Sequence, residues 1–267
     1  MKIGALIPVR LASERLPGKA LADISGRPMI AHLLDRVAAS RFISSRQDVV
    51  ICTTTAASDD PLVAAVEAEG CSVFRGSVND IIQRLGKAMK HFGFDVVIQA
   101  DGDDPLSATE SMDLTTEVLL ADPDLDIVTI RGLPLGTATK SFTRRAMDKV
   151  LQHYRTQQND TGFIYFFTKS GLCRHLDLAA DNPAWRHDAA RLTLDYEADL
   201  DLFRRIFSAL YKAGSVFGLA EVVAFLNRNP DIVKLNLDLQ DEYWRRTAEK
   251  VKLEYIAPDG TMHDIGV

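Results

Sequence analysis

Three cations follow the first apolar run of the chain at short spacing. Residues 3–8 are hydrophobic, and Arg10, Arg15 and Lys19 come directly afterwards in a loop that contains Gly18. Arginine can bind two phosphate oxygens at once, whereas lysine acts as a mobile point charge, so Arg15 and Lys19 suit a departing pyrophosphate. The alternative is that these cations are solvated surface charges. Their position at the end of a strand favours a polyphosphate site, and with it a nucleotide.

A second candidate group is acidic. Asp101, Asp103 and Asp104 follow residues 96–100, a run too apolar to lie on the surface. Neighbouring carboxylates raise one another's pKa values unless a cation neutralises them. Mg²⁺ would neutralise them and would also bridge to phosphate oxygens. The alternative is helix capping, in which Asp103 or Asp104 caps a helix that begins near Ser107.

Asp195 is a weaker candidate when it is considered alone. It ends the strand-like run 191–194 and precedes a helix. An aspartate at such a place is most often an N-cap or a turn former. A metal-binding role for Asp195 requires that the fold place it beside Asp103.

The elements that must position these residues alternate between short apolar runs and longer amphipathic ones. We expect strands at residues 3–8, 49–53, 72–74, 96–100, 127–130 and 191–194. We expect helices around residues 29–37, 81–89, 143–154 and 200–210. This alternation predicts an α/β fold with a mostly parallel sheet and helices on both of its faces. In such sheets ligands bind at the carboxyl ends of the strands, where both candidate groups lie.

The pattern changes near residue 231. We predict a main domain over residues 1–230 and a small C-terminal α+β extension over residues 231–267. The extension contains a helix near 241–250, a strand at 252–256 and a turn signal at 258–260. We expect it to pack on the same domain or on the partner of a homodimer.

The overall composition is that of an ordinary globular protein. The chain has 267 residues, of which 46% are hydrophobic and 25% are charged, and its formal net charge is −6. This charge argues against a nucleic-acid or membrane partner, since proteins that bind them usually present a net basic surface. No apolar run approaches the ~20 residues needed to span a bilayer. Three cysteines without metal-ligand spacing, and no signal-like N-terminus, predict a cytoplasmic protein with reduced thiols.

The cationic loop resembles the opening signature of a known family. Its sequence, Arg10-Leu-Ala-Ser13-Glu-Arg15-Leu-Pro-Gly18-Lys19, is similar to the start of bacterial cytidylyltransferases that make CMP-activated acidic sugars. The family includes 3-deoxy-manno-octulosonate and acylneuraminate cytidylyltransferases, and the resemblance is strongest to its SpsF-like polysaccharide-biosynthesis branch. It spans about residues 1–212, through blocks that begin at Thr53, Phe74, Gly102 and Arg191. It implies a Rossmann-like sheet of the nucleotide-diphospho-sugar transferase type.

The resemblance also implies a role for each matching residue. The residues implied to hold the CTP phosphates are Arg10, Ser13, Arg15 and Lys19, and those implied for the base and ribose are Arg75 and Gly76. The implied Mg²⁺ ligands are Asp103 and Asp195. The residues implied to bind the sugar are Pro134, Gly136 and Phe142. The implied partners are CTP and an acidic sugar, and the implied cofactor is Mg²⁺. Residues 157–163 depart from the branch, which carries a basic block there.

The resemblance implies a transfer of CMP for surface polysaccharide or glycoconjugate biosynthesis. The anomeric hydroxyl of an octulosonic or nonulosonic acid would attack the α-phosphorus of CTP, and pyrophosphate would leave. We expect Arg15, Lys19 and Asp103 to be catalytic, because the two cations stabilise the leaving group and Mg²⁺ on Asp103 neutralises the phosphates. The alternative is a metal-dependent glycosyltransferase, because Asp101-Gly102-Asp103 is a D-x-D pattern that suits a sugar nucleotide.

Overall fold

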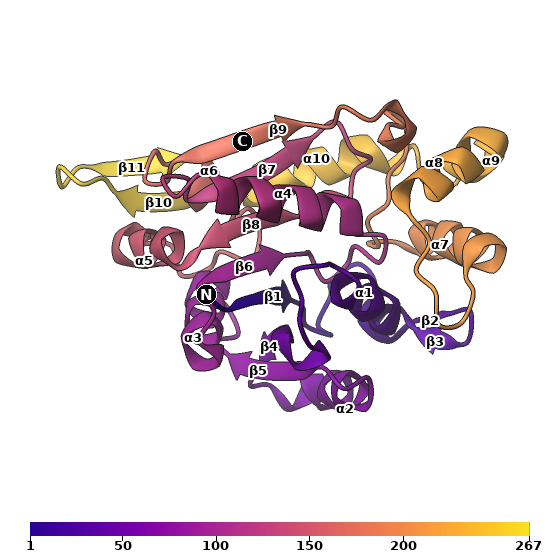
Figure 1. The fold of residues 1–267 in the computed structure, drawn as a ribbon, viewed down its shortest axis with the longest axis horizontal. Helices are drawn as coiled ribbons and strands as arrows, with labels where there is room; N and C mark the ends of the chain where they lie inside the picture. The colour runs from indigo at the N-terminus through magenta and orange to yellow at the C-terminus, as the bar shows by residue number, and fades with distance from the viewer. Residues whose placement is uncertain (267) are drawn as a thin grey trace.

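A seven-stranded mixed sheet runs through the centre of the protein (Figure 1). In the computed structural model, which describes residues 1–266, its strand order is β5-β4-β1-β6-β8-β7-β9. The strands of this sheet are β1 Ile3–Pro8, β4 Val49–Thr54, β5 Ser72–Gly76, β6 Val96–Gln99, β7 Ile127–Arg131, β8 Lys140–Thr143 and β9 His175–Ala179. Two separate hairpins are formed by β2 Asp23–Ile24 with β3 Arg27–Pro28, and by β10 Leu253–Ile256 with β11 Met262–Ile265.

Most neighbouring strands of the sheet are parallel. β5, β4, β1 and β6 pair in parallel, and so do β7 and β9. β8 lies between β6 and β7 and is antiparallel to both. The carboxyl ends of β1, β4, β5 and β6 therefore meet at one edge of the sheet. The predicted α/β fold with a mostly parallel sheet is confirmed, although the sequence pattern predicted neither β8 nor β9.

Helices cover both faces of the sheet. The helices are α1 Met29–Ala38, α2 Asp60–Ala68, α3 Ile81–Phe92, α4 Thr109–Ala121, α5 Arg144–His153, α6 Tyr165–Thr168, α7 Glu197–Leu210, α8 Leu219–Arg228, α9 Pro230–Val233 and α10 Leu239–Lys250. Short 3-10 helices lie at Lys19–Leu21, Arg46–Asp48, Ala57–Asp59 and Pro183–Trp185. In β1, Ala5 and Ile7 pack in one core cluster with Leu33 of α1, whereas Leu6 packs in another with Leu85 of α3. Because both faces are buried, the strand is a continuous apolar run.

The structure corrects one predicted strand. Residues 191–194 form no strand, and within residues 1–266 their only strand-like pairing is an isolated bridge between Arg191 and Leu135. The N–H of Leu192 donates to the carbonyl of Leu135 at 2.7 Å, and the N–H of Leu194 donates to the carbonyl of Asp103 at 2.8 Å. The segment is hydrogen-bonded to two loops at the carboxyl edge of the sheet, which explains why it has the apolar alternation of a strand without being one.

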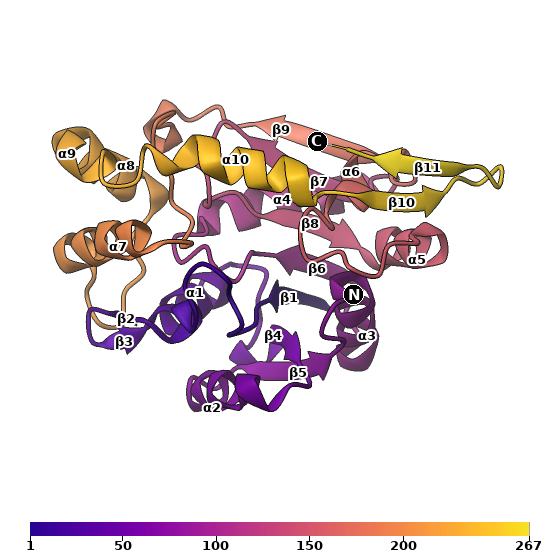
Figure 2. The same cartoon turned by 180° about the vertical axis from the view of Figure 1, so that it is seen from behind.

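The C-terminal segment packs on the rest of the same chain. The β10–β11 hairpin buries Leu253 and Ile265 in the core cluster that contains residues of α3 and α5. The N–H of Arg155 donates to the carbonyl of Glu254 at 2.8 Å. Figure 2 shows α10 crossing the molecule between α9 and this hairpin. The division into two domains at residue 230 stays a prediction.

All three cysteines are buried. Cys52, Cys71 and Cys173 form no disulfide within the described part of the chain. Burial raises the pKa of the Cys52 and Cys173 thiols to about 12, so both stay protonated at neutral pH. Over residues 1–266, none of the helices has the length and apolar character needed to cross a membrane.

Gly136 permits a close approach of two backbones. Its φ angle is +86°, and a Cβ atom at this position would lie 2.2 Å from the carbonyl oxygen of Leu192 and 2.7 Å from the nitrogen of Thr193. Both are backbone atoms, which cannot rotate away as a side chain can. Glycine therefore allows the segment before β8 to lie against residues 192–193.

Replacing Gly136 by alanine should lower the free energy of unfolding by about 3 kcal/mol, measured by urea denaturation. A left-handed backbone costs alanine about 1–2 kcal/mol, and overpacking adds about 1–3 kcal/mol. Gly171 is the matched control, because its φ angle is +75° and the space around it is open. Gly171→Ala should cost only about 1–2 kcal/mol. Equal losses in the two variants would contradict the close approach.

Candidate functional site

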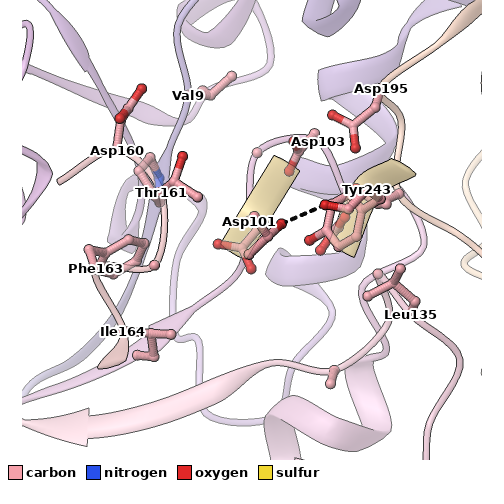
Figure 3. A pocket seen from close by; sticks show the side chains of 18 of the residues that line it. Val9, Asp101, Asp103, Leu135, Asp160, Thr161, Phe163, Ile164, Asp195 and Tyr243 are labelled. Carbon is pink, nitrogen blue, oxygen red and sulfur yellow. Dashed lines mark hydrogen bonds between the residues drawn. The ribbon is translucent and has the colours of Figure 1, made fainter. Parts of the chain in front are cut away.

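A cavity of about 880 Å³ opens at the carboxyl ends of β1 and β6. Its walls come from the loops after β1 and β6, the segment between β7 and β8, residues 160–165 and α10. Figure 3 shows Asp103, Asp195 and Tyr243 on one side of this cavity, opposite residues 160–164. The volume lies in the range of small-molecule sites, roughly 300–1,000 Å³.

The ammonium group of Lys19 joins three parts of the chain. Its Nζ donates to Oδ2 of Asp103 at 2.8 Å, to Oδ1 of Asp195 at 3.0 Å and to the carbonyl of Leu194 at 2.6 Å. An ammonium group has three N–H donors, and here each has an acceptor. Gly18 precedes Lys19 with a φ angle of +72° and turns the chain toward these acceptors. The cationic loop, the acidic loop and the end of residues 191–194 thus meet at one point.

Asp195 is held in place from behind by α7. Its carboxylate forms ion pairs with Arg15 and with Arg191, whose Nη2 lies 2.9 Å from Oδ2. Asp199 accepts hydrogen bonds from the backbone N–H groups of Asp195 and Tyr196, each at 2.8 Å, and pairs with Arg191. Arg191, Asp195 and Asp199 are buried. This network fixes the direction in which the Asp195 carboxylate points.

Lys19 and Asp103 keep each other ionised. Burial would raise the pKa of Asp103, but the charge of Lys19 and its hydrogen bond outweigh burial and hold this pKa below its usual value. Burial would likewise lower the pKa of Lys19, but the charges of Asp103 and Asp195 raise it above its usual value. At neutral pH the ammonium is positive and the Asp103 carboxylate is negative.

The other two aspartates of the acidic loop have different surroundings. Asp101 accepts from Nζ of Lys140 at 2.6 Å and from Nε2 of Gln99 at 2.9 Å. Asp104 is buried, and burial together with the charges of Asp103 and Asp101 raises its pKa well above the usual value. Of the three carboxylates, only that of Asp103 binds the ammonium group that Asp195 also binds.

Most of the predicted site residues line the cavity. Those that do are Arg10, Ser13, Arg15, Lys19, Asp103, Pro134, Gly136 and Asp195. Arg75 and Gly76 lie outside its wall, and the guanidinium of Arg75 pairs with Asp60 at 2.6 Å. Phe142 belongs to β8, is fully buried and packs against Phe167, so the structure corrects its predicted place beside the sugar. The roles of the lining residues stay predictions.

The helix-capping alternatives are not realised. The N-cap of α4 is Ala108, so neither Asp103 nor Asp104 caps this helix. The N-cap of α7 is Tyr196, which leaves the carboxylate of Asp195 free of capping contacts. Neither carboxylate is used as a helix cap, and both bind the Lys19 ammonium group.

The helix α10 contributes cavity residues that no motif predicted. They are Gln240, Tyr243, Trp244, Arg246, Thr247 and Lys250. The guanidinium of Arg191 lies 5.3 Å from the ring of Tyr243, within the range of a cation–π contact. Burial, followed by the charge of Asp104, raises the pKa of Tyr243. The sequence pattern predicted a helix here, but it carried no sign that the helix would reach the site.

The donor set formed by Asp103 and Asp195 fits Mg²⁺. Both carboxylates already bind one cation, the Lys19 ammonium, so they converge on a common point. Mg²⁺ is usually held by one or two carboxylates, with water and substrate phosphates as its other ligands. Within residues 1–266, no group of three or more His, Cys, Asp or Glu side chains could hold a metal ion. The other ligands of a metal at this site would be water and nucleotide phosphates.

Comparisons with known proteins identify relatives of this chain. A family model described as cytidylyltransferase matches residues 4–209. The chain is 35% identical over 210 residues to the 3-deoxy-manno-octulosonate cytidylyltransferase of Geobacter sulfurreducens, covering 78% of each chain. It is 28% identical over 229 residues to the spore coat polysaccharide biosynthesis protein SpsF of Bacillus subtilis, covering 85% of this chain and 94% of that relative. A cytidylyltransferase structure from Leptospira borgpetersenii superposes with a TM-score of 0.78 at 26% identity, covering 87% of this chain and 97% of that one.

Replacing Lys19 by methionine should lower the free energy of unfolding by about 3 kcal/mol at pH 7 in a chelating buffer, because two carboxylates lose their shared cation. The loss should shrink with acidification. In the wild type the pKa of Asp103 is depressed, so its contribution to stability is lost as the pH falls through that value. In the variant, burial raises the pKa of Asp103, so protonation stabilises the fold as the pH falls.

Urea denaturation between pH 7 and about pH 4 measures this difference. The matched control is Lys90→Met, since Lys90 is an exposed residue of α3. The control should differ from wild type by less than about 0.5 kcal/mol. A Lys19→Met loss that is constant across the pH range would contradict the proposed charge balance.

Proposed function

This chain belongs to the cytidylyltransferase family, and we propose that it transfers CMP from CTP to an acidic 2-keto-3-deoxy sugar with release of pyrophosphate. Its membership makes the chain a CTP-dependent nucleotidyltransferase. The acceptor class, octulosonic or nonulosonic acids, is the proposal. One observation carries the nucleotidyl transfer: Lys19 of the loop after β1 binds both Asp103 and Asp195, and Arg15 of the same loop pairs with Asp195.

The chain's own residues supply charge and position. Arg15 and Lys19 lie beside the two carboxylates, where they stabilise the negative charge that develops on the leaving pyrophosphate. Asp103 and Asp195 would hold Mg²⁺, which when bound neutralises the phosphates and lowers the pKa of the attacking hydroxyl. Arg191 and Asp199 keep the Asp195 carboxylate in place during this step. Positioning and electrostatics suffice for phosphoryl chemistry, so no protein nucleophile is required.

The proposed acceptor site lies in the segment between β7 and β8. Pro134 and Gly136 line the cavity there, and the carbonyl of Leu135 accepts from the N–H of Leu192 at 2.7 Å. This bond ties the segment to residues 192–194, which lead to Asp195. An acceptor held there would lie next to the metal-binding carboxylates. The names of the relatives that act on 3-deoxy-manno-octulosonate or build spore coat polysaccharide support an acidic sugar and a surface polysaccharide product.

The glycosyltransferase alternative finds no support in the geometry of its motif. Asp101 and Asp103 do not share a cation, because Asp101 binds Lys140 whereas Asp103 binds Lys19. Gly102 separates them, and a Cβ atom there would lie 2.7 Å from the carbonyl oxygen of Pro8. Glycine thus lets the acidic loop lie against the start of the cationic loop.

A pyrophosphate-release screen tests the proposed function. The purified protein is combined with each of the four nucleoside triphosphates, Mg²⁺ and a panel of octulosonic, nonulosonic and neutral sugars. We expect release with CTP and at least one acidic sugar, and none without Mg²⁺. No release with any acidic sugar would overturn the proposed acceptor class. Thermal stabilisation by UDP- or GDP-sugars but not by CTP would favour the glycosyltransferase instead.

Replacing Asp103 by asparagine should reduce pyrophosphate release at least about a hundredfold, because the site loses the carboxylate that faces Asp195. Folding should persist, since the Asp103 side chain is one-third exposed. The melting temperature measures folding in parallel. Asp201→Asn is the matched control, because Asp201 is an exposed residue of α7, and it should keep wild-type activity. Unchanged activity in Asp103→Asn would refute its role.

A further inference from the structure

The family match ends before the helix that completes the cavity. Residues 4–209 match the family model, whereas α10 begins at Leu239. This helix nevertheless lines the same cavity as Lys19 and Asp103. Its function is therefore not accounted for by the motifs of the matched region.

Two cations of α10 reach the loop that follows β1. Nη2 of Arg246 lies 3.3 Å from Oε2 of Glu14, and Nζ of Lys250 lies 3.0 Å from the same oxygen. Glu14 stands between Ser13 and Arg15, in the loop proposed to hold the phosphates. Its hydrogen bond and charge interaction with Lys250 lower the pKa of Glu14, so it is ionised at neutral pH.

Each cation of this loop also has an acidic partner in the protein. Arg10 pairs with Asp160 at 3.0 Å, and Arg15 pairs with Asp195. Glu14 differs from these residues, because it is an anion in a loop whose cations would bind phosphate. A bound triphosphate would repel the Glu14 carboxylate and attract the cations that now bind it.

We infer that α10 completes the phosphate site: Arg246 and Lys250 bind the terminal phosphates of CTP and exchange the Glu14 carboxylate for phosphate oxygens when the nucleotide binds. The inference rests on the nucleotide half of the proposed function and is independent of the acceptor. Arginine binds phosphate through two parallel N–H donors, and the lysine adds a mobile charge. The spacing of the two residues, i and i+4, places both on one face of the helix.

The position of these cations favours phosphate over the carboxylate of the acceptor. Both bind a residue of the phosphate loop, and neither binds the segment between β7 and β8 where the acceptor is proposed to lie. The side chain of Arg246 is 31% exposed and that of Lys250 is 43% exposed, so both can change partners without disturbing the core.

Calorimetric titration with CTP and with CMP, each with Mg²⁺, tests this inference on the full-length protein. The double variant Arg246→Gln, Lys250→Gln should bind CTP about tenfold to a hundredfold more weakly, because two charge-assisted contacts are lost. Its affinity for CMP should change less than about twofold, because CMP lacks the terminal phosphates. The control Arg245→Gln, Lys234→Gln removes the same charge from exposed positions, and it should bind CTP as the wild type does.

The variant Glu14→Gln distinguishes the inferred exchange from a purely structural contact. It should bind CTP at least as tightly as the wild type, because the cations lose a competing carboxylate. Three results would overturn the inference. The first is an equal loss of CTP and CMP affinity in the double variant, and the second is a loss of CTP affinity in Glu14→Gln. The third is a double variant in which the KM for the acidic sugar rises while the KM for CTP does not change. Wild-type protein that binds no CTP would instead contradict the proposed function itself.

Discussion

The contact of the Lys19 ammonium with Asp103 and Asp195 is the interaction on which the site depends. It joins the loop after β1 to carboxylates 84 and 176 residues further along the chain. Lys19 is buried, and the charges of Asp103 and Asp195 raise its pKa and keep its ammonium group positive. The parallel pairing of β1 with β6 brings the first two loops together, and residues 191–194 carry Asp195 across the same edge of the sheet.

The same balance of charge extends around the cavity. The ion pair of Arg10 with Asp160 and the contacts of Glu14 with α10 join the loop after β1 to two other walls. Protein carboxylates thus pair with the cations that would bind phosphate, and protein cations pair with the carboxylates that would bind a divalent metal. In the proposed site, the phosphates and the metal would take the place of these protein partners.

The parts of this arrangement differ in how far the sequence predicts them. β1, β4 and β6 are largely apolar because both faces of the sheet are buried, and Asp103 is predictable from its place after such a run. β8 is short and begins with a lysine that lines the cavity, so its sequence lacks the apolar pattern that would predict a strand. The position of Asp195 beside Asp103 could not be predicted from the sequence pattern, because the segment before Asp195 is not a strand and is placed by tertiary contacts. Arg246 and Lys250 lie on a polar helix. Its composition does not distinguish cations that face solvent from cations that face a ligand, so the sequence did not predict their place at the cavity.

A crystal structure of the protein with CTP and Mg²⁺ is the most direct test of the central claim, that the cations and carboxylates around Lys19 form a nucleotide and metal site. We predict a metal ion bound by Asp103 and Asp195, with phosphate oxygens on Arg15 and Lys19. A nucleotide bound elsewhere, or one bound here while Lys19 keeps both of its carboxylate contacts and no metal reaches them, would contradict the account.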